Sequence, residues 1–241
     1  MPADPPFVLP VPDVTRALHD SLELYLPSTA DPAPAVLLVH GVPYSAEGRS
    51  LPSAWQIYQG YASQLADRGC VATTVDHSPD GLPDDDRSNA ALAAAIDSLR
   101  THPRVDGDRV ALWFFSGAGP LASAFLRRPP SWLRCVALTY PVLGDSELVT
   151  VRGVHPVEAV KGAGALPLVI TVVGRELPDV APTQPPFVEA ARAAGAELTL
   201  IEVPEGRHGF DVLDHTEESR QAVVAALSAV TISVGAETAH G

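Results

Sequence analysis

Apolar runs of five to eight residues alternate with amphipathic stretches from residue 36 almost to the end of the chain. A continuous apolar run is typical of a strand buried on both faces of a sheet. The amphipathic stretches carry apolar residues at helical spacing, and the first of them stops at Gly69. Repeated strand–helix units predict an α/β fold, a parallel sheet with helices on both faces. The expected strands are 36–40, 70–76, 109–115, 133–140, 166–173 and 197–203, and the expected helices are 52–68, 90–101, 116–128, 185–195 and 215–230.

Two segments depart from this repeat. In 15–27, Leu22, Leu24 and Leu26 alternate with polar neighbours, which predicts an N-terminal antiparallel strand. The segment 141–165 is mixed, and its 25 residues are too few for a large cap domain. We therefore expect a site that is open or covered only by short loops.

The length of 241 residues fits one α/β domain with a single sizeable core. Hydrophobic residues make up 46% of the chain and charged residues 19%, which excludes disorder as a global description. We expect a single domain over 1–241, with loose termini at about 1–13 and 232–241.

The formal net charge is −13, from 16 basic and 29 acidic residues. This balance argues against nucleic acid or an anionic membrane as a partner and suits a neutral or apolar small molecule. No apolar run approaches the ~20 residues of a membrane span, and the first residues lack the pattern of a signal peptide. Cys70 and Cys135 lie in apolar runs and are expected to be buried, reduced thiols of a cytoplasmic protein. The sequence leaves open whether two copies form a homodimer.

Ser116 stands at the sharp passage from the strand 109–115 into the helix 116–128. A side chain there projects from the carboxyl end of the sheet, where open parallel sheets carry their sites. The small residues Gly117 and Ala118 follow, as a tight turn requires. The hydroxyl is therefore interpreted either as a nucleophile beside N–H groups that stabilise an oxyanion or as an ordinary helix N-cap.

A serine nucleophile needs a base, and the base needs an acid that orients it. Glu176 follows the strand 166–173, and His208 follows the strand 197–203. The order serine, acid, histidine along the chain is that of α/β-hydrolases. At this point the chain resembles a dienelactone-hydrolase-like serine hydrolase over roughly 20–230. The resemblance is carried by VLLVHG (36–41), DGDRVALWFFSGAG (106–119), LPLVITVVGRE (166–176) and PEGRHGF (204–210).

The resemblance implies an α/β-hydrolase fold with a mostly parallel central sheet, helices on both faces and little or no cap domain. It implies Ser116 as nucleophile, His208 as base and Glu176 as the orienting acid. Asp179 lies three residues beyond Glu176 and is the alternative acid. The acid is therefore left open between these two carboxylates, with a third reading in which neither serves.

The residues around the nucleophile depart from the family pattern Gly-x-Ser-x-Gly. The chain has Phe114 two residues before Ser116 and Ala118 two residues after it. The glycine that Phe114 replaces normally packs close to the following helix. Either the small Ala118 and Gly119 accommodate the ring, or the turn is distorted.

The oxyanion hole implied by the resemblance combines the backbone N–H groups of Gly117 and Val42, because Pro43 has no N–H. Tyr44 is expected either to offer its hydroxyl to the pocket or to be an ordinary half-buried tyrosine. His40 is expected to fix the loop that carries Val42.

The sequence predicts no cofactor and no metal. It has no glycine-rich nucleotide-binding motif after a first strand, and no cluster has metal-ligand spacing. The pair Asp76-His77 and the acidic run 84–86 are weak exceptions.

Three functions remain in competition. The first is hydrolysis of a small carboxylic ester or lactone through an acyl-enzyme. The second is a non-hydrolytic reaction on the same scaffold, by an acyl transferase, lyase or cyclase of secondary metabolism, motivated by Phe114. The third is a catalytically silent protein that binds a ligand.

Overall fold

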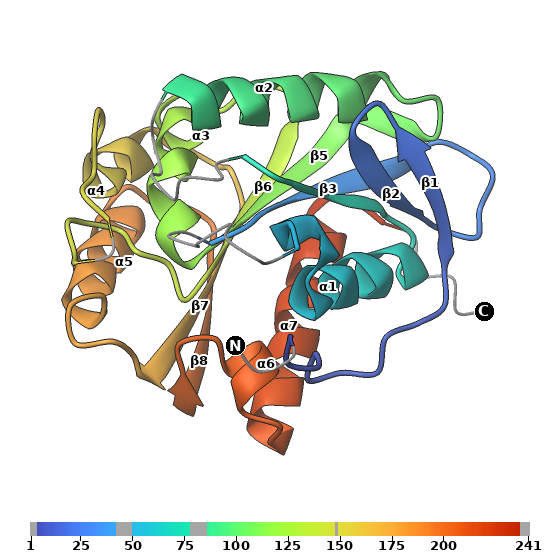
Figure 1. Cartoon of the computed structure of the whole chain (residues 1–241). Coiled ribbons are helices and arrows are strands. Elements are labelled where there is room, and N and C mark those ends of the chain that lie inside the picture. The colour runs from blue at the N-terminus through green and yellow to red at the C-terminus, as the bar shows by residue number, and fades with distance from the viewer. Residues whose placement is uncertain (1–3, 42–49, 78–85, 148, 237–241) are drawn as a thin grey trace.

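The computed structural model describes residues 4–41, 50–77, 86–147 and 149–236 (Figure 1). Eight strands of these residues form one sheet in the order β1-β2-β4-β3-β5-β6-β7-β8. β2 pairs antiparallel with β1 and β4, and every pairing from β4 across to β8 is parallel. The predicted α/β class is confirmed. The strands are β1 (Thr15–His19), β2 (Leu22–Leu26), β3 (Ala33–Val39), β4 (Val71–Val75), β5 (Val105–Phe115), β6 (Leu133–Thr139), β7 (Leu168–Arg175) and β8 (Leu198–Arg207).

Helices cover both faces of the sheet, as Figure 1 shows. Side chains alternate across a strand, so Leu37 and Leu112 enter one core layer while Leu38 and Trp113 enter the other. The first layer is closed by α2 (Asp86–Thr101), α3 (Ser123–Arg127) and α5 (Gln184–Ala193), the second by α1 (Gln56–Asp67) and α7 (Glu217–Ser233). Shorter helices are α4 (Pro156–Ala159), α6 (Phe210–Leu213), and the 3₁₀ turns η1 (Pro52–Ala54), η2 (Ser116–Ala122), η3 (Val160–Gly162) and η4 (Ala181–Thr183).

The N-terminal strand predicted over 15–27 is wrong in one respect, because the segment is a hairpin of β1 and β2. Asp20 has φ of 51°, a left-handed conformation that aspartate tolerates in tight turns. The alternation of leucines is real, but it belongs to β2, which lies between β1 and β4.

The helix predicted over 116–128 is also only partly correct. Its first seven residues form the 3₁₀ turn η2, and the α-helix α3 begins at Ser123. Pro120 and the flanking glycines are poor formers of the α-helical hydrogen-bond ladder, which explains the tighter turn. The expected mixed segment 141–165 contains only the short α4 and η3 among its described residues.

The terminal segments are held more firmly than the sequence predicts. Phe7 is buried and packs against Tyr61, with ring centroids 4.9 Å apart, and the N–H of Val8 donates to the carbonyl of Asp211. At the other end, α7 continues to Ser233 and Val234 is buried. The expectation of loose termini is wrong for these residues, because apolar side chains dock them on the core.

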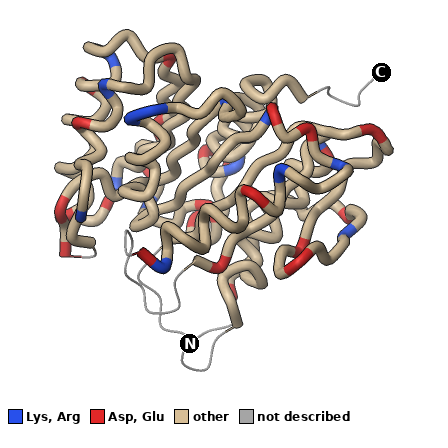
Figure 2. Tube along the Cα trace, turned by 90° about the horizontal axis from the view of Figure 1, so that it is seen from above, with Lys and Arg blue, Asp and Glu red and all other residues tan. Residues whose placement is uncertain are grey.

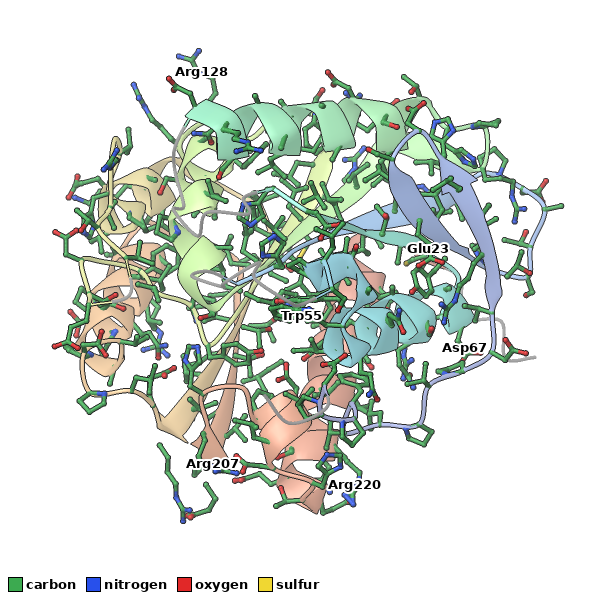
Figure 3. All side chains as sticks on the ribbon, in the orientation of Figure 1. Glu23, Trp55, Asp67, Arg128, Arg207 and Arg220 are labelled. Atoms are coloured by element: carbon green, nitrogen blue, oxygen red, sulfur yellow. The ribbon has the colours of Figure 1, made fainter. Side chains whose placement is uncertain are left out.

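Charged side chains are spread around the described part of the chain, with acidic and basic positions interspersed (Figure 2). Figure 3 shows Arg128, Arg207 and Arg220 at the periphery of the molecule. Within the ranges that the structure describes, every helix is too short or too polar to cross a lipid bilayer.

Candidate active site

Ser116 is the residue at which β5 turns into η2. Its φ is 50°, a conformation that non-glycine residues adopt only where the surroundings hold them. Its carbonyl accepts a hydrogen bond of 2.9 Å from the N–H of Val142, which follows β6. A Cβ on Gly41 would lie 3.0 Å from Cβ of Ser116, so the backbone after β3 approaches the serine closely. The turn therefore presents the hydroxyl at the carboxyl end of the sheet.

Phe114 is accommodated without loss of this strained turn. It is fully buried in the same core layer as Ala118 and Leu121, and its ring centroid lies 6.3 Å from that of Phe125. Strand alternation places the rings of Phe114 and Phe115 in opposite core layers, so Phe114 packs as an ordinary core residue. Two alternatives were considered for Phe114, and the structure shows the first: small neighbours accommodate the ring.

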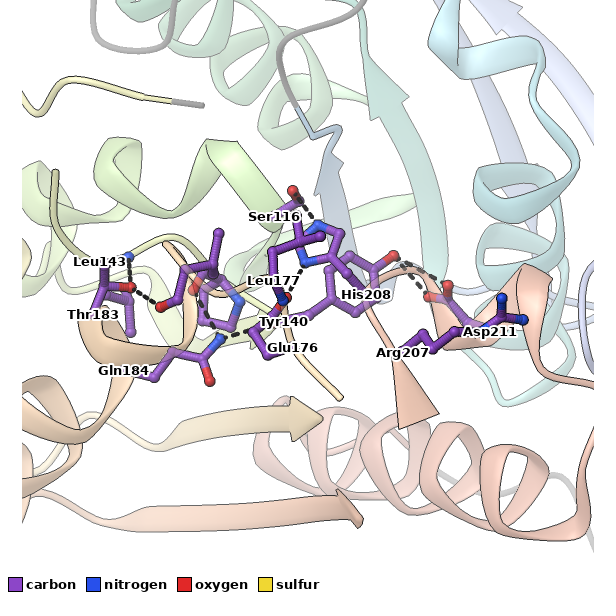
Figure 4. Close-up of polar contacts among 12 residues, drawn as sticks. Ser116, Tyr140, Leu143, Glu176, Leu177, Thr183, Gln184, Arg207, His208 and Asp211 are labelled. Carbon is purple, nitrogen blue, oxygen red and sulfur yellow. Dashed lines mark hydrogen bonds and ion pairs between the residues drawn. The ribbon is translucent and has the colours of Figure 1, made fainter. Parts of the chain in front are cut away.

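His208 lies at the end of β8, beside Ser116. Its Nε2 is 2.7 Å from Oγ of Ser116, although 92 residues separate the two in sequence. The residue after it, Gly209, has φ of 81° and leads directly into α6. The imidazole is partly exposed, with 18% of the side chain accessible. Figure 4 shows the ring between Ser116 and Glu176, with one ring nitrogen directed at each.

Glu176 completes a hydrogen-bonded relay on the far side of the imidazole. Its Oε1 lies 2.6 Å from Nδ1 of His208, and only 2% of its side chain is exposed. The N–H of Leu177 donates to the same oxygen at 2.7 Å. An ionised carboxylate here accepts from Nδ1–H, which leaves Nε2 free to accept the proton of Ser116.

Gln184 is a site residue that the sequence analysis missed. Its amide Nε2 donates to Oε2 of Glu176 at 3.2 Å and to the carbonyl of Pro141 at 3.1 Å (Figure 4). It is buried at the start of α5. A glutamine at a helix start carries no distinctive sequence signal, so only the packing of α5 against the loop after β7 could reveal it.

Asp179, the alternative acid, is directed elsewhere. Its Oδ2 accepts a hydrogen bond of 2.9 Å from the N–H of Glu147, in the loop after β6. The structure thus brings Glu176, and not Asp179, to His208.

Of the expected oxyanion-hole residues, Gly117 lies in the first turn of η2 and Val42 lies outside the described residues, as does the expected pocket residue Tyr44. The first N–H groups of a helical turn have no partner within it and point toward its N-terminus. The N–H of Gly41 donates to the hydroxyl of Tyr58 at 2.9 Å, which fixes the start of the loop after β3.

His40 and His77 form a buried stack, with ring centroids 4.0 Å apart. Nδ1 of His40 lies 2.9 Å from the carbonyl of Gly41, and Nε2 accepts from the N–H of His77. Burial, and next the neighbouring His77, lowers the pKa of His40 to about 3. His40 is thus a neutral residue that holds the backbone at Gly41.

Two further residues beside the relay were missed by the sequence analysis. Tyr140, directly after β6, has its ring centroid 4.7 Å from that of His208. Asp211, in α6, is fully buried and accepts hydrogen bonds from the Tyr140 hydroxyl. Asp211 lies three residues after His208, but only the fold shows that it is inside the molecule.

The weak metal candidates do not form a cluster in the parts of the chain described. Asp76 accepts hydrogen bonds from the backbone N–H and the hydroxyl of Ser53, at 2.9 and 2.6 Å. Asp84 and Asp85 lie outside the described residues. Across residues 4–41, 50–77, 86–147 and 149–236, no three or more His, Cys, Asp or Glu side chains gather as metal ligands would.

No protein-family model and no curated protein matches the chain in sequence. Solved structures match it in fold. An esterase from Thermogutta terrifontis with bound butyrate aligns with a TM-score of 0.70 and 19% identity, over 96% of this chain and 98% of that one. The same esterase phosphorylated by paraoxon has a TM-score of 0.68 and 20% identity, over 96% and 98%. A protein assigned as a dienelactone hydrolase from Klebsiella pneumoniae has 0.67 and 18%, over 87% and 92%. The chain therefore has the α/β-hydrolase fold.

Proposed function

We propose that the chain is a serine hydrolase that cleaves a small carboxylic ester or lactone through an acyl-enzyme intermediate. The observation that carries the proposal is the relay of two short contacts, 2.7 Å from Ser116 to His208 and 2.6 Å from His208 to Glu176. It is built on a serine held at φ of 50°. Serine, imidazole and carboxylate in this order form the arrangement that activates a hydroxyl for acyl transfer.

The reaction begins when His208 takes the Ser116 proton on Nε2 while Oγ bonds to the substrate carbonyl carbon. The tetrahedral intermediate collapses as the carbon–oxygen bond to the alcohol breaks, and the imidazolium returns the proton to the leaving oxygen. Water then gives a proton to His208 and attacks the acyl carbon. The bond between this carbon and Oγ of Ser116 breaks, the imidazolium returns the proton to Oγ, and the acid is released. Glu176 holds the imidazole tautomer and stabilises its cation throughout.

The negative charge of each tetrahedral intermediate needs N–H donors. We assign this role to the backbone N–H groups of Gly117 and Val42, which follow β5 and β3. The support comes from the close approach of Gly41 to Ser116, because it brings the loop after β3 to the nucleophile.

The substrate class is supported by two further observations. The esterase of similar fold has structures with bound butyrate and propionate, and others phosphorylated by paraoxon. The net charge of −13 disfavours anionic substrates. We therefore propose neutral esters with short acyl chains as the first substrates to test.

The direct experiment is labelling and turnover of the Ser116→Ala variant. We expect wild-type protein to hydrolyse aryl esters of graded chain length and to be labelled by a phosphonate probe, whereas Ser116→Ala loses labelling and several orders of magnitude in kcat. Ser123→Ala is the matched control, because Ser123 is a buried serine seven residues further along, at the start of α3. Equal turnover in Ser116→Ala and wild type would overturn the proposal.

The same assay separates hydrolysis from acyl transfer. Phe114 is fully buried in a core layer and the left-handed turn at Ser116 is kept, so the reason for preferring a non-hydrolytic reaction is weakened. An acyl group that stays on Ser116 until an added alcohol or amine accepts it would favour transfer.

A cytoplasmic location is part of the proposal. Cys70 and Cys135 are both buried free thiols, and burial raises the pKa of each to about 12. Such thiols are unreactive and fit a reducing compartment.

A further inference from the structure

Asp211 is a buried carboxylate three residues after His208. It lies in the single turn of α6, with none of its surface exposed. The hydroxyl of Tyr140 donates to both of its oxygens, at 3.1 and 3.0 Å, and the hydroxyl of Tyr61 donates to Oδ2 at 3.1 Å. Figure 4 shows Asp211 and Glu176 on different sides of His208, with the Tyr140 side chain reaching from the site toward Asp211. Glu176 thus contacts the imidazole directly, and Asp211 is linked to it by the Tyr140 ring.

Tyr140 links Asp211 to the imidazole. Its φ is 36°, an uncommon conformation for an aromatic residue, and its N–H donates to the carbonyl of Thr171 at 2.8 Å. One end of the side chain is therefore fixed by strained backbone and the other by hydrogen bonds to Asp211. Between them, the ring lies against His208 with centroids 4.7 Å apart and planes inclined by 52°. The position of the Tyr140 ring against His208 therefore depends on Asp211.

The placement of a carboxyl group here is energetically unfavourable unless its charge is used or compensated. Burial raises the pKa of Asp211 to about 7, while the hydroxyls of Tyr140 and Tyr61 and the nearby His208 act in the opposite direction. An apolar residue would fill the same space without this penalty. An apolar residue would lack the negative charge, and this charge interacts with His208.

We propose that Asp211, acting through Tyr140, is a positioning residue for His208 that holds the imidazole in line with Ser116 and stabilises its cation. The inference rests on the proposed function, since the cation forms when His208 takes the serine proton. Glu176 contacts Nδ1 directly, whereas Asp211 acts across the Tyr140 ring.

Four titratable side chains face Asp211 among the described residues. They are Tyr58 and Tyr61 from α1, Tyr140 from the end of β6, and His208 from the end of β8. Burial raises the pKa of all three tyrosines above their ordinary value, so their hydroxyls stay protonated as donors. Asp211, whose pKa burial raises to about 7, is thus the carboxyl group of this cluster that changes charge near neutral pH.

The main test compares Asp211→Asn with wild type in ester hydrolysis at pH 9, where Asp211 is ionised. We expect kcat to fall by about tenfold with KM changed by less than about twofold, because the lost charge acts on the transition state. We also expect the acid limb of the kcat/KM profile to move to lower pH, because the imidazolium loses a neighbouring negative charge.

Tyr140→Phe keeps the ring and removes only the hydroxyl, so it tests the link even if Asp211→Asn does not fold. We expect it to lower kcat in the same direction, by about threefold. Tyr61→Phe is the matched control, since it removes one hydroxyl from Asp211 without touching the Tyr140–His208 contact. It should lower the melting temperature but leave kcat at pH 9 within about twofold.

An NMR titration of the His208 ring separates this inference from the proposed function, because it needs no turnover. Its signal is assigned by its absence in His208→Gln. A shift of the His208 titration to lower pH in Asp211→Asn supports the positioning role even if no ester is hydrolysed. A folded Asp211→Asn protein with unchanged His208 titration and unchanged kcat would make Asp211 a purely structural residue and overturn the inference.

Discussion

Glu176 contacts the imidazole of His208 directly, Asp211 reaches it only through the Tyr140 ring, and the two carboxyl groups accept hydrogen bonds from different donors. Glu176 accepts a backbone N–H from Leu177, the Gln184 amide and Nδ1 of His208. Asp211 accepts two tyrosine hydroxyls within the core. The donors around Glu176 are N–H groups, including that of the partly exposed His208, whereas those around Asp211 are the hydroxyls of two buried tyrosines.

This difference shows how the surroundings of two carboxyl groups give them different roles. A carboxylate that accepts N–H groups and lies against a histidine can stay charged and bond to the cation directly. A carboxyl group in the core is pushed toward neutrality, and the pKa of Asp211 is raised to about 7 by burial. We therefore expect unequal effects when each charge is removed.

The largest effect expected from this comparison is that of Glu176→Gln. The amide keeps the shape but can present its N–H to Nδ1 and favour the wrong imidazole tautomer, at a cost on the order of 10⁴ in kcat in chymotrypsin-type enzymes. Asp179→Asn is the control, because Asp179 bonds to the backbone of Glu147 instead. Steady-state kinetics on an aryl ester should show less than about twofold change in the control. A loss in Asp179→Asn as large as in Glu176→Gln would refute the assignment.

A smaller effect is expected from Gln184→Met, which keeps the length of the side chain but removes the amide. Glu176 loses one of its donors and the carbonyl of Pro141 loses its own, so kcat should fall by about tenfold and stability by about 1–3 kcal/mol. Gln221→Met is the control, because Gln221 bonds only across the exposed surface of α7, to Glu217. If both variants behave alike in kinetics and thermal unfolding, Gln184 does not support the acid.

The smallest effect expected is on the pH dependence of stability. Asp211 has a folded-state pKa of about 7 against an ordinary value of 3.8. Between these values the folded protein binds more protons than the unfolded chain, so this residue's contribution to stability falls as pH rises and levels off above about 7. Asparagine does not titrate.

The measurement is urea unfolding of wild type and Asp211→Asn at a series of pH values. From pH 6 to pH 7, the free energy of unfolding of wild type should fall relative to the variant by less than about 1.4 kcal/mol. A constant difference from pH 4 to pH 8 would mean that the Asp211 carboxyl is not perturbed by burial.

The order of strands and helices is readable from this sequence because hydrophobic periodicity is a local property. A strand such as β3 is apolar throughout and a helix such as α1 is amphipathic, whatever the rest of the chain does. Boundaries were less predictable. The hairpin at Asp20 and the 3₁₀ turn after Ser116 depend on single-residue backbone conformations that periodicity does not encode.

The sequence by itself determined the α/β class and the order of Ser116, Glu176 and His208, since each follows a strand and parallel strands end at the same edge. Tertiary structure alone decided which carboxylate meets Nδ1, that Phe114 fits, and that Gln184, Tyr140 and Asp211 surround the relay. These contacts join residues up to 150 positions apart, as between Tyr61 and Asp211. No local pattern encodes them, because they arise only when helices from separate parts of the chain close over the sheet.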